Sequence, residues 1–125
     1  MTDWAVILGV SSGFGAAAAK ELAKNKINIY GIHLDRKASM ESINNFKNEL
    51  KENKVEVIFK NISATDDTVR KDTTEELISK KDVRVKVLLH SLAFGALKPV
   101  FDDTISSSLN QKQIEMTQNV MANSL

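Results

Sequence analysis

Short apolar runs recur along the chain at similar intervals, and each of them predicts a β-strand. They lie at Trp4–Gly9, Ile27–His33, Val55–Lys60 and Val83–His90. Apolar residues at helical steps of three and four predict helices between them, over Gly15–Asn25, Ser39–Asn53 and Ser63–Lys80. Strands that alternate with helices are typical of βαβ units, which form a parallel sheet with right-handed crossovers. The pattern therefore predicts an α/β fold.

Two local patterns refine this outline. The run Ser63-Ala64-Thr65-Asp66 opens the third helical segment and predicts a capping box there. The fourth strand is nearly all apolar over Val85–Leu89, and a strand of that kind is expected to be covered on both faces.

A further helix is predicted at the end of the sequence, approached through Phe101–Ser108. Its apolar positions are Ile114, Thr117, Val120, Met121 and Leu125. The helical pattern is still complete at the last residue, and neither a C-terminal cap nor another strand follows it. We therefore expect residues 1–125 to form one incomplete domain, truncated after the fourth strand and the following helix.

The composition excludes several classes of function. Charged residues make up 26% of the chain and the net charge is +1, so nothing indicates a nucleic acid or an acidic membrane as partner. The chain has no cysteine, and His33 and His90 lack a third ligand at a suitable spacing, so we expect no disulfide and no metal site. Neither a signal peptide nor a membrane span is recognisable, which predicts a cytoplasmic protein.

The strongest chemical signal is a glycine-rich turn between the first strand and the first helix. Its sequence is Leu8-Gly9-Val10-Ser11-Ser12-Gly13-Phe14-Gly15. The glycines allow a tight turn, a close approach of the backbone to a ligand, and packing of the helix on the strand. Backbone N–H groups and the positive end of the helix dipole then meet at one point. This arrangement suits the pyrophosphate of a dinucleotide.

The G-x-x-x-G-x-G spacing and the βαβ rhythm together resemble the short-chain dehydrogenase/reductase family, over the N-terminal half of such a subunit. The resemblance implies a Rossmann-type doubly wound parallel sheet with strand order 3-2-1-4 and helices on both faces. Where the family usually has Thr-Gly, this chain has Leu8-Gly9. The cofactor-binding residues implied at the turn are Gly9, Ser11, Ser12, Gly13, Phe14 and Gly15.

Two later segments carry the same resemblance. Asn61-Ile62 stands where family members commonly have Asp-Val, whose acid binds the adenine amino group; Asn61 keeps an acceptor and loses the charge. The segment His90-Ser91-Leu92-Ala93-Phe94-Gly95 takes the place of Asn-Asn-Ala-Gly, which lines the cofactor, and implies cofactor contacts for His90, Ser91, Leu92 and Ala93. Its departure from the common pattern looks like the branch that contains the bacterial enoyl-acyl-carrier-protein reductases.

The family's proton donor is a tyrosine whose pKa is lowered by a nearby lysine. The one tyrosine of this chain, Tyr30, falls in the second predicted strand, beside the adenosine half of a cofactor. The catalytic tyrosine and lysine are therefore expected beyond Leu125. Asn119 matches the asparagine that holds a water in the family's proton relay, and it is the catalytic position implied within this chain.

The loop after the second strand is expected to select the cofactor. An acid there binds the ribose 2′-hydroxyl, whereas an arginine binds a 2′-phosphate. The chain offers both, since Asp35 is followed by Arg36 and Lys37. Asp35 lies slightly farther from the glycine turn than is usual, so His33 and Leu34 are alternatives for the reading position. The expected cofactor is NADP or NAD, and the two cations favour NADP.

The resemblance implies an NAD(P)-dependent oxidoreductase that, when complete, reduces the enoyl double bond of an acyl thioester, as in fatty acid biosynthesis. A ketoacyl or other carbonyl reductase is the alternative, because both use this half-domain. Another alternative is a non-catalytic fragment that binds a nucleotide or self-associates through its uncovered last strand. The expected partners are a small-molecule or acyl-carrier substrate and a second copy of the chain, which would contact Ile114, Met121 and Leu125.

A hydrolase is disfavoured, although Ser91 follows His90. Adjacent residues at the end of a strand point to opposite sides, and no strained serine turn precedes a helix there.

Overall fold

The computed structural model describes residues 1–92 and 98–123, and the chain divides into two compact units, Met1–Ser91 and Leu92–Leu125. The first unit contains β1 (Thr2–Leu8), α1 (Gly13–Lys24), β2 (Asn28–His33), the 3-10 turn η1 (Lys37–Ser39), α2 (Met40–Lys51), β3 (Val57–Asn61), α3 (Asp67–Ser79) and β4 (Val83–His90). The second contains η2 (Ile105–Ser107), α4 (Gln111–Gln118) and the π-helical turn η3 (Asn119–Asn123).

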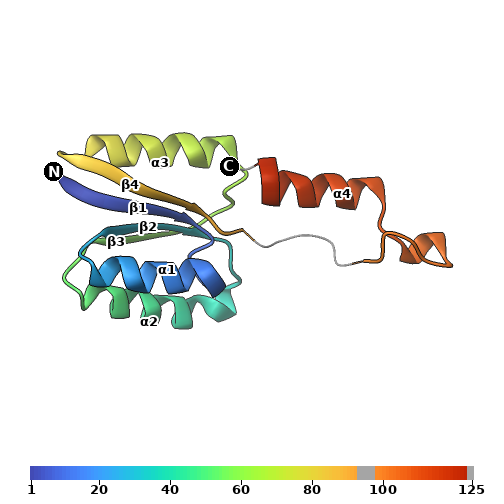
Figure 1. Ribbon diagram of the computed structural model, residues 1–125, viewed down its shortest axis with the longest axis horizontal. Coiled ribbons are helices and arrows are strands. Elements are labelled where there is room, and N and C mark those ends of the chain that lie inside the picture. Colours follow the sequence, from blue (N-terminus) through green and yellow to red (C-terminus); the bar gives the residue numbers. More distant parts are fainter. Residues whose placement is uncertain (93–97, 124–125) are drawn as a thin grey trace. The chain divides into compact units, whose positions relative to one another are not determined.

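The first unit is built on a parallel sheet of four strands in the order β3-β2-β1-β4. Helices α1 and α2 cover one face of the sheet and α3 covers the other (Figure 1). The Rossmann-type doubly wound arrangement and its strand order are therefore confirmed. In register, Leu8 lies beside both Ile32 and His90, and His33 lies beside Asn61. The carboxyl ends of all the strands consequently meet along one edge.

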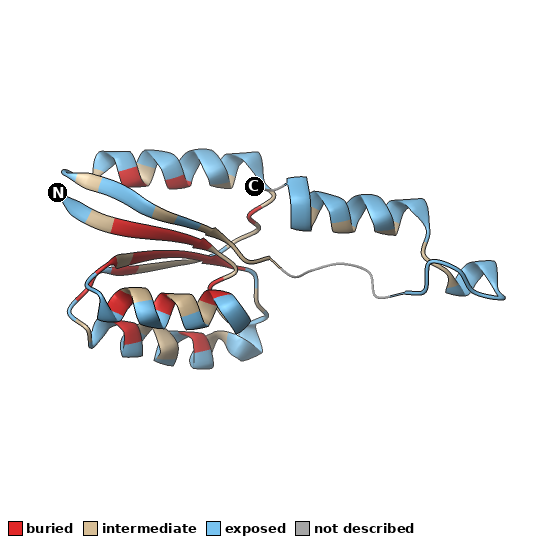
Figure 2. Ribbon diagram, viewed as in Figure 1, coloured by how far each residue is buried: buried red, intermediate tan, exposed pale blue. Residues whose placement is uncertain are grey.

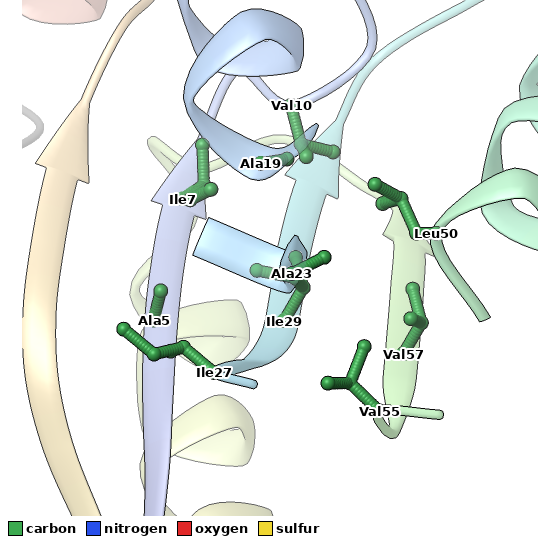
Figure 3. Packing of buried hydrophobic residues seen from close by; sticks show 10 residues of the cluster. All are labelled: Ala5, Ile7, Val10, Ala19, Ala23, Ile27, Ile29, Leu50, Val55 and Val57. Atoms are coloured by element: carbon green, nitrogen blue, oxygen red, sulfur yellow. The ribbon is translucent and has the colours of Figure 1, made fainter. Parts of the chain in front are cut away.

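The main core lies between the sheet and the helices α1 and α2. Figure 2 shows buried residues concentrated on the central strands β1 and β2, with further buried positions on α1 and α2. Figure 3 shows the cluster that fills this layer, formed by Ala5, Ile7, Val10, Ala19, Ala23, Ile27, Ile29, Leu50, Val55 and Val57. The small side chains of Ala19 and Ala23 are fully buried, which lets α1 pack close to the strands beneath it.

Helix α3 begins later than the sequence predicts, and the expected capping box at its start is wrong. Asp66 is the N-cap, and its Oδ1 accepts the backbone N–H of Thr68 at 2.8 Å. Ser63 and Thr65 instead form a turn in which their hydroxyl oxygens lie 2.7 Å apart. A capping aspartate bonds the N–H two residues on without needing a glutamate three residues on, so a helix can start here without the box.

The expectation that β4 is covered on both faces is also wrong for the described residues. The pairing register with β1 shifts between Trp4 and Ala5, so that Lys86 is an extra residue between the paired Val85 and Val87. Val87 pairs with the core residue Ala5 and packs against the core, whereas Val85 and Leu88 are 48% and 61% exposed. Beside them lies a depression of about 540 Å³, which α3 shares through residues such as Leu77 and Ile78.

The second unit confirms a helix where the apolar stripe near the chain end predicts one. Asn110 caps α4 in a capping box, accepting the backbone N–H of Gln113 at 2.9 Å, while the Gln113 side chain accepts the backbone N–H of Asn110. Ile114 and Met121 are 47% and 43% exposed. Leu125, also expected in this stripe, lies outside the described residues. Among the described helices, none has the length and apolar character needed to cross a membrane.

Candidate functional site at the carboxyl edge of the sheet

The turn after β1 has the backbone geometry that its glycines predict. Gly9 and Gly13 adopt left-handed conformations, with φ of 91° and 57°. The turn is tied to β2, because the N–H groups of Gly9 and Val10 both donate to the carbonyl of Ile32, at 2.8 and 3.2 Å. A Cβ atom added to Gly15 would overlap the carbonyl oxygen of Gly9. The close approach of α1 to this turn therefore requires glycine at position 15.

The start of α1 presents unsatisfied backbone donors. Ser12 is the N-cap in an extended conformation, and its side chain makes no capping hydrogen bond. No acidic residue lies in the first turn of the helix. Within the described part of the chain, the N–H groups of Gly13, Phe14 and Gly15 have no hydrogen-bond acceptor. Such a helix start attracts an anion through both its donors and its dipole, so these residues fit a pyrophosphate.

Of the positions at the end of β2 that are expected to read the ribose, Leu34, Arg36 and Lys37 are exposed, whereas His33 and Asp35 are not. The side chain of His33 is buried, and its Nδ1 lies 3.0 Å from Oδ2 of Asp35. Leu34 is 71% exposed but apolar. Arg36 and Lys37 are exposed. In the loop expected to bind the ribose, the Asp35 carboxylate therefore contacts His33, whereas Arg36 and Lys37 are exposed to solvent.

At the end of β3, Asn61 bonds this same loop. Its Oδ1 accepts the backbone N–H of Asp35 at 2.9 Å, and its Nδ2 donates to the carbonyl oxygen of Asp35 at 3.1 Å. The next residue, Ile62, donates its N–H to the carbonyl of His33 at 2.8 Å. The amide that the sequence assigns to adenine thus holds the β2–α2 loop through both of its polar atoms.

At the end of β4, the backbone N–H of Ser91 donates to the carbonyl of Leu8 at 2.8 Å. His90, Ser91 and Leu92 are partly buried. His90 is the last residue of β4 and lies beside Leu8, the last residue of β1 before the glycine turn. Ala93, the last expected cofactor contact of this segment, lies outside the described residues. The structure therefore gathers the ends of all four strands at one edge of the sheet.

Asn119, the expected proton-relay residue, belongs to the second unit. It is exposed and is the first residue of the π-helical turn that continues α4. Among the described residues, no three histidine or acidic side chains come together in a way that could hold a metal ion.

The burial and the pKa of Tyr30 are both unlike those expected of a catalytic proton donor. Its side chain is 1% exposed, and its hydroxyl donates to Oε2 of Glu76 on α3 at 2.8 Å. Burial, followed by smaller effects that include the Glu76 carboxylate, raises the pKa of Tyr30 to about 12. A catalytic tyrosine needs a lowered pKa to exchange its proton near neutral pH.

The raised pKa of Tyr30 predicts an alkaline loss of stability. Below pH 10 the phenol is neutral in both states and its contribution is complete; between pH 10 and about 12 only the unfolded chain ionises. The free energy of unfolding should fall by at most about 3 kcal/mol across this interval. Urea unfolding at a series of pH values measures it, with Tyr30→Phe as control. If the wild type and Tyr30→Phe lose equal stability between pH 10 and 12, the raised pKa is refuted.

Comparison with known proteins agrees with this architecture. The sequence profile of the short chain dehydrogenase family matches residues 3–125, whereas no curated protein matches the sequence significantly. Among solved structures, YwfH, an NADPH dependent reductase involved in bacilysin biosynthesis, is similar with a TM-score of 0.77 and 19% identity, over 99% of this chain and 48% of that one.

Two other similar structures have related descriptions. NAD+-bound xylitol dehydrogenase has a TM-score of 0.76 and 16% identity, covering 98% of this chain and 43% of its own. An alcohol dehydrogenase from the archaeon Thermococcus sibiricus, complexed with 5-hydroxy-NADP, has a TM-score of 0.71 and 21% identity, covering 96% and 47%. The chain thus spans about half the length of these proteins. With its profile match and its Rossmann-type sheet, the chain belongs to the short-chain dehydrogenase family.

Proposed function

We propose that this chain supplies the cofactor-binding half of an NAD(P)-dependent reductase. The observation that carries the proposal is the start of α1, where the N–H groups of Gly13, Phe14 and Gly15 lack acceptors in the described part of the chain. A pyrophosphate would satisfy these donors and interact favourably with the helix dipole. Nicotinamide, when bound, supplies the hydride for reduction.

The remaining contacts follow from the other strand ends. The pyrophosphate would be held by Gly9, Ser11, Ser12, Gly13, Phe14 and Gly15; the adenosine half by Asp35, Arg36, Asn61 and Ile62; and the floor of the site by His90, Ser91, Leu92 and Ala93. The exposed Arg36 and Lys37 support NADP rather than NAD, because a guanidinium pairs well with a phosphate. The descriptions of similar structures include both cofactors.

For the reaction of the whole protein, we propose reduction of an enoyl thioester. The support is the resemblance of the segment that begins at His90 to enoyl-acyl-carrier-protein reductases. Reduction of a ketoacyl or other carbonyl group is the alternative. Either reaction needs a proton donor, and the buried Tyr30 is unsuited to that role. Asn119 would hold a water in the proton relay rather than donate the proton itself.

The proposed partners are a small-molecule or acyl-carrier substrate and a second copy of the chain. The exposed Ile114 and Met121 support the second copy, since exposed apolar side chains favour association. The exposed Val85 and Leu88 on β4 favour the alternative of a non-catalytic, self-associating protein. The lack of cysteine suits a reducing compartment, so we propose a cytoplasmic location.

Calorimetric measurement of NADPH binding and an assay of NADPH oxidation test this function. We expect the 125-residue chain to bind NADPH without oxidising it when an enoyl thioester is added. The whole protein should oxidise NADPH faster with a 2-enoyl thioester than with the matching 3-ketoacyl thioester. The reverse order would favour the carbonyl reductase, and failure of the chain to bind NADPH or NADH would contradict the cofactor site itself.

A further inference from the structure

We infer that Asn61 is a positioning residue that sets the cofactor preference of the site. It would do so by holding the β2–α2 loop, residues 34–39, in a conformation in which Arg36 and Lys37 are exposed and the Asp35 carboxylate faces His33. The inference rests on the proposed function, because it concerns the same nucleotide. It adds a specificity-determining role for Asn61, which belongs to β3 and not to the loop that reads the ribose.

The amide of Asn61 fixes the backbone of the loop at one residue. It accepts the N–H of Asp35 at 2.9 Å and donates to the carbonyl oxygen of Asp35 at 3.1 Å. Because the N–H and the carbonyl of one residue belong to different peptide groups, these two hydrogen bonds restrict the rotation of both peptide groups that flank Asp35. An aspartate in place of Asn61, as is common in the family, could accept the N–H but has no N–H of its own to donate.

His33 then fixes the carboxylate of the residue that Asn61 holds. Its Nδ1 lies 3.0 Å from Oδ2 of Asp35, and since an ionised carboxylate carries no proton, the imidazole is the donor. The His33 ring is itself held, because it is 3% exposed and packs edge-on against Phe59 at 5.9 Å between ring centroids. One carboxylate oxygen of Asp35 is therefore occupied by an inward-facing donor.

The residues that follow carry the exposed charge of the loop. Arg36 and Lys37 are exposed, and neither forms an ion pair within the described part of the chain. A phosphate on the ribose would meet these cations, whereas the Asp35 carboxylate is already bonded. If Asn61 released the loop, Asp35 could turn outward and repel the phosphate. The preference for the phosphorylated ribose thus depends on a residue that need not touch that phosphate.

The test compares ADP-ribose with 2′-phospho-ADP-ribose by calorimetry on the 125-residue chain. We expect the wild type to bind the phosphorylated ligand at least about tenfold more tightly. Asn61→Ala should reduce that preference at least about fivefold, with a smaller change in the affinity for ADP-ribose. The matched control is Asn28→Ala, because the Asn28 side chain accepts the backbone N–H of Glu56 at 2.8 Å across the same strand pair, at the other end. This control should keep the wild-type preference.

A second variant, Asp35→Asn, tests the inference even if Asn61→Ala fails to fold. Asp35→Asn removes a carboxylate that His33 already holds through Oδ2, so the preference should rise less than about threefold. A rise of tenfold or more would overturn the inference, because the carboxylate would then face the ribose. So would a wild type without preference, or equal effects of Asn61→Ala and Asn28→Ala. A wild type that binds neither ligand would instead overturn the proposed function, and the inference with it.

Discussion

Replacing Gly15 with alanine is expected to lower the free energy of unfolding by more than about 3 kcal/mol. The added Cβ would overlap the carbonyl oxygen of Gly9 and crowd the backbone of Val10. These are backbone atoms of a turn bonded to β2, so they cannot move aside as a flexible side chain would. Urea denaturation followed by circular dichroism measures the loss.

The matched control is Gly13→Ala in the same turn. A Cβ at Gly13 would meet nothing within 4 Å, but the residue has a φ of 57°. Its replacement should cost only about 1 kcal/mol, the strain of a left-handed alanine. If Gly15→Ala is no more destabilising than Gly13→Ala, then α1 does not approach the glycine turn as closely as the structure has it.

Replacing Ser12 with aspartate is expected to weaken NADPH binding at least about 100-fold without destabilising the fold. Ser12 is the N-cap of α1, and aspartate is as good an N-cap as serine. The new carboxylate would interact favourably with the helix dipole, but it would lie where the pyrophosphate is proposed to bind. Two like charges about 4 Å apart repel by about 4 kcal/mol at an effective dielectric constant of 20. Calorimetry gives the affinity, and thermal unfolding gives the stability.

Asn48→Asp provides the control for net charge. Asn48 is exposed near the end of α2, at the edge of the sheet opposite to the glycine turn, and its replacement adds the same charge. It should leave NADPH binding within about twofold of the wild type, since exposed charges far apart are screened. If Ser12→Asp and Asn48→Asp weaken NADPH binding equally, then either the nucleotide binds elsewhere or the weakening is caused by the change in net charge alone.

The strands could be predicted because each has an apolar run whose neighbours are polar or turn-forming. The bounds predicted for β4 are confirmed, whereas those of β1, β2 and β3 differ by one or two residues. These ends depend on partners far away in the sequence. β1 begins at Thr2 rather than Trp4, since Thr2 donates its N–H to Asp82 at 2.6 Å and Asp3 pairs with Arg84 on β4. The exposed face of β4 escaped prediction for a similar reason. The shift in its register with β1 is a property of the strand pair and leaves no mark in the apolar run itself.

The candidate site likewise has one part that the sequence predicts and one part that it does not. The glycine turn was predictable, because left-handed backbone conformations and a close helix approach require glycine at fixed spacings. The contacts of Asn61 and His33 with Asp35 were not, since they join β2 to β3 through the folded sheet. The spacing His33-Leu34-Asp35 is the one local signal, as two residues apart on an extended segment share a side.

The proposed nucleotide site at the start of α1 can be tested by amide chemical shifts of the isotope-labelled chain, recorded by NMR during titration with NADPH. We expect the largest changes at Gly13, Phe14 and Gly15, whose N–H groups would become donors to the pyrophosphate. Smaller changes should appear at Arg36 and Asn61. Saturable binding that leaves the three amides at the start of α1 unchanged would contradict a pyrophosphate site there.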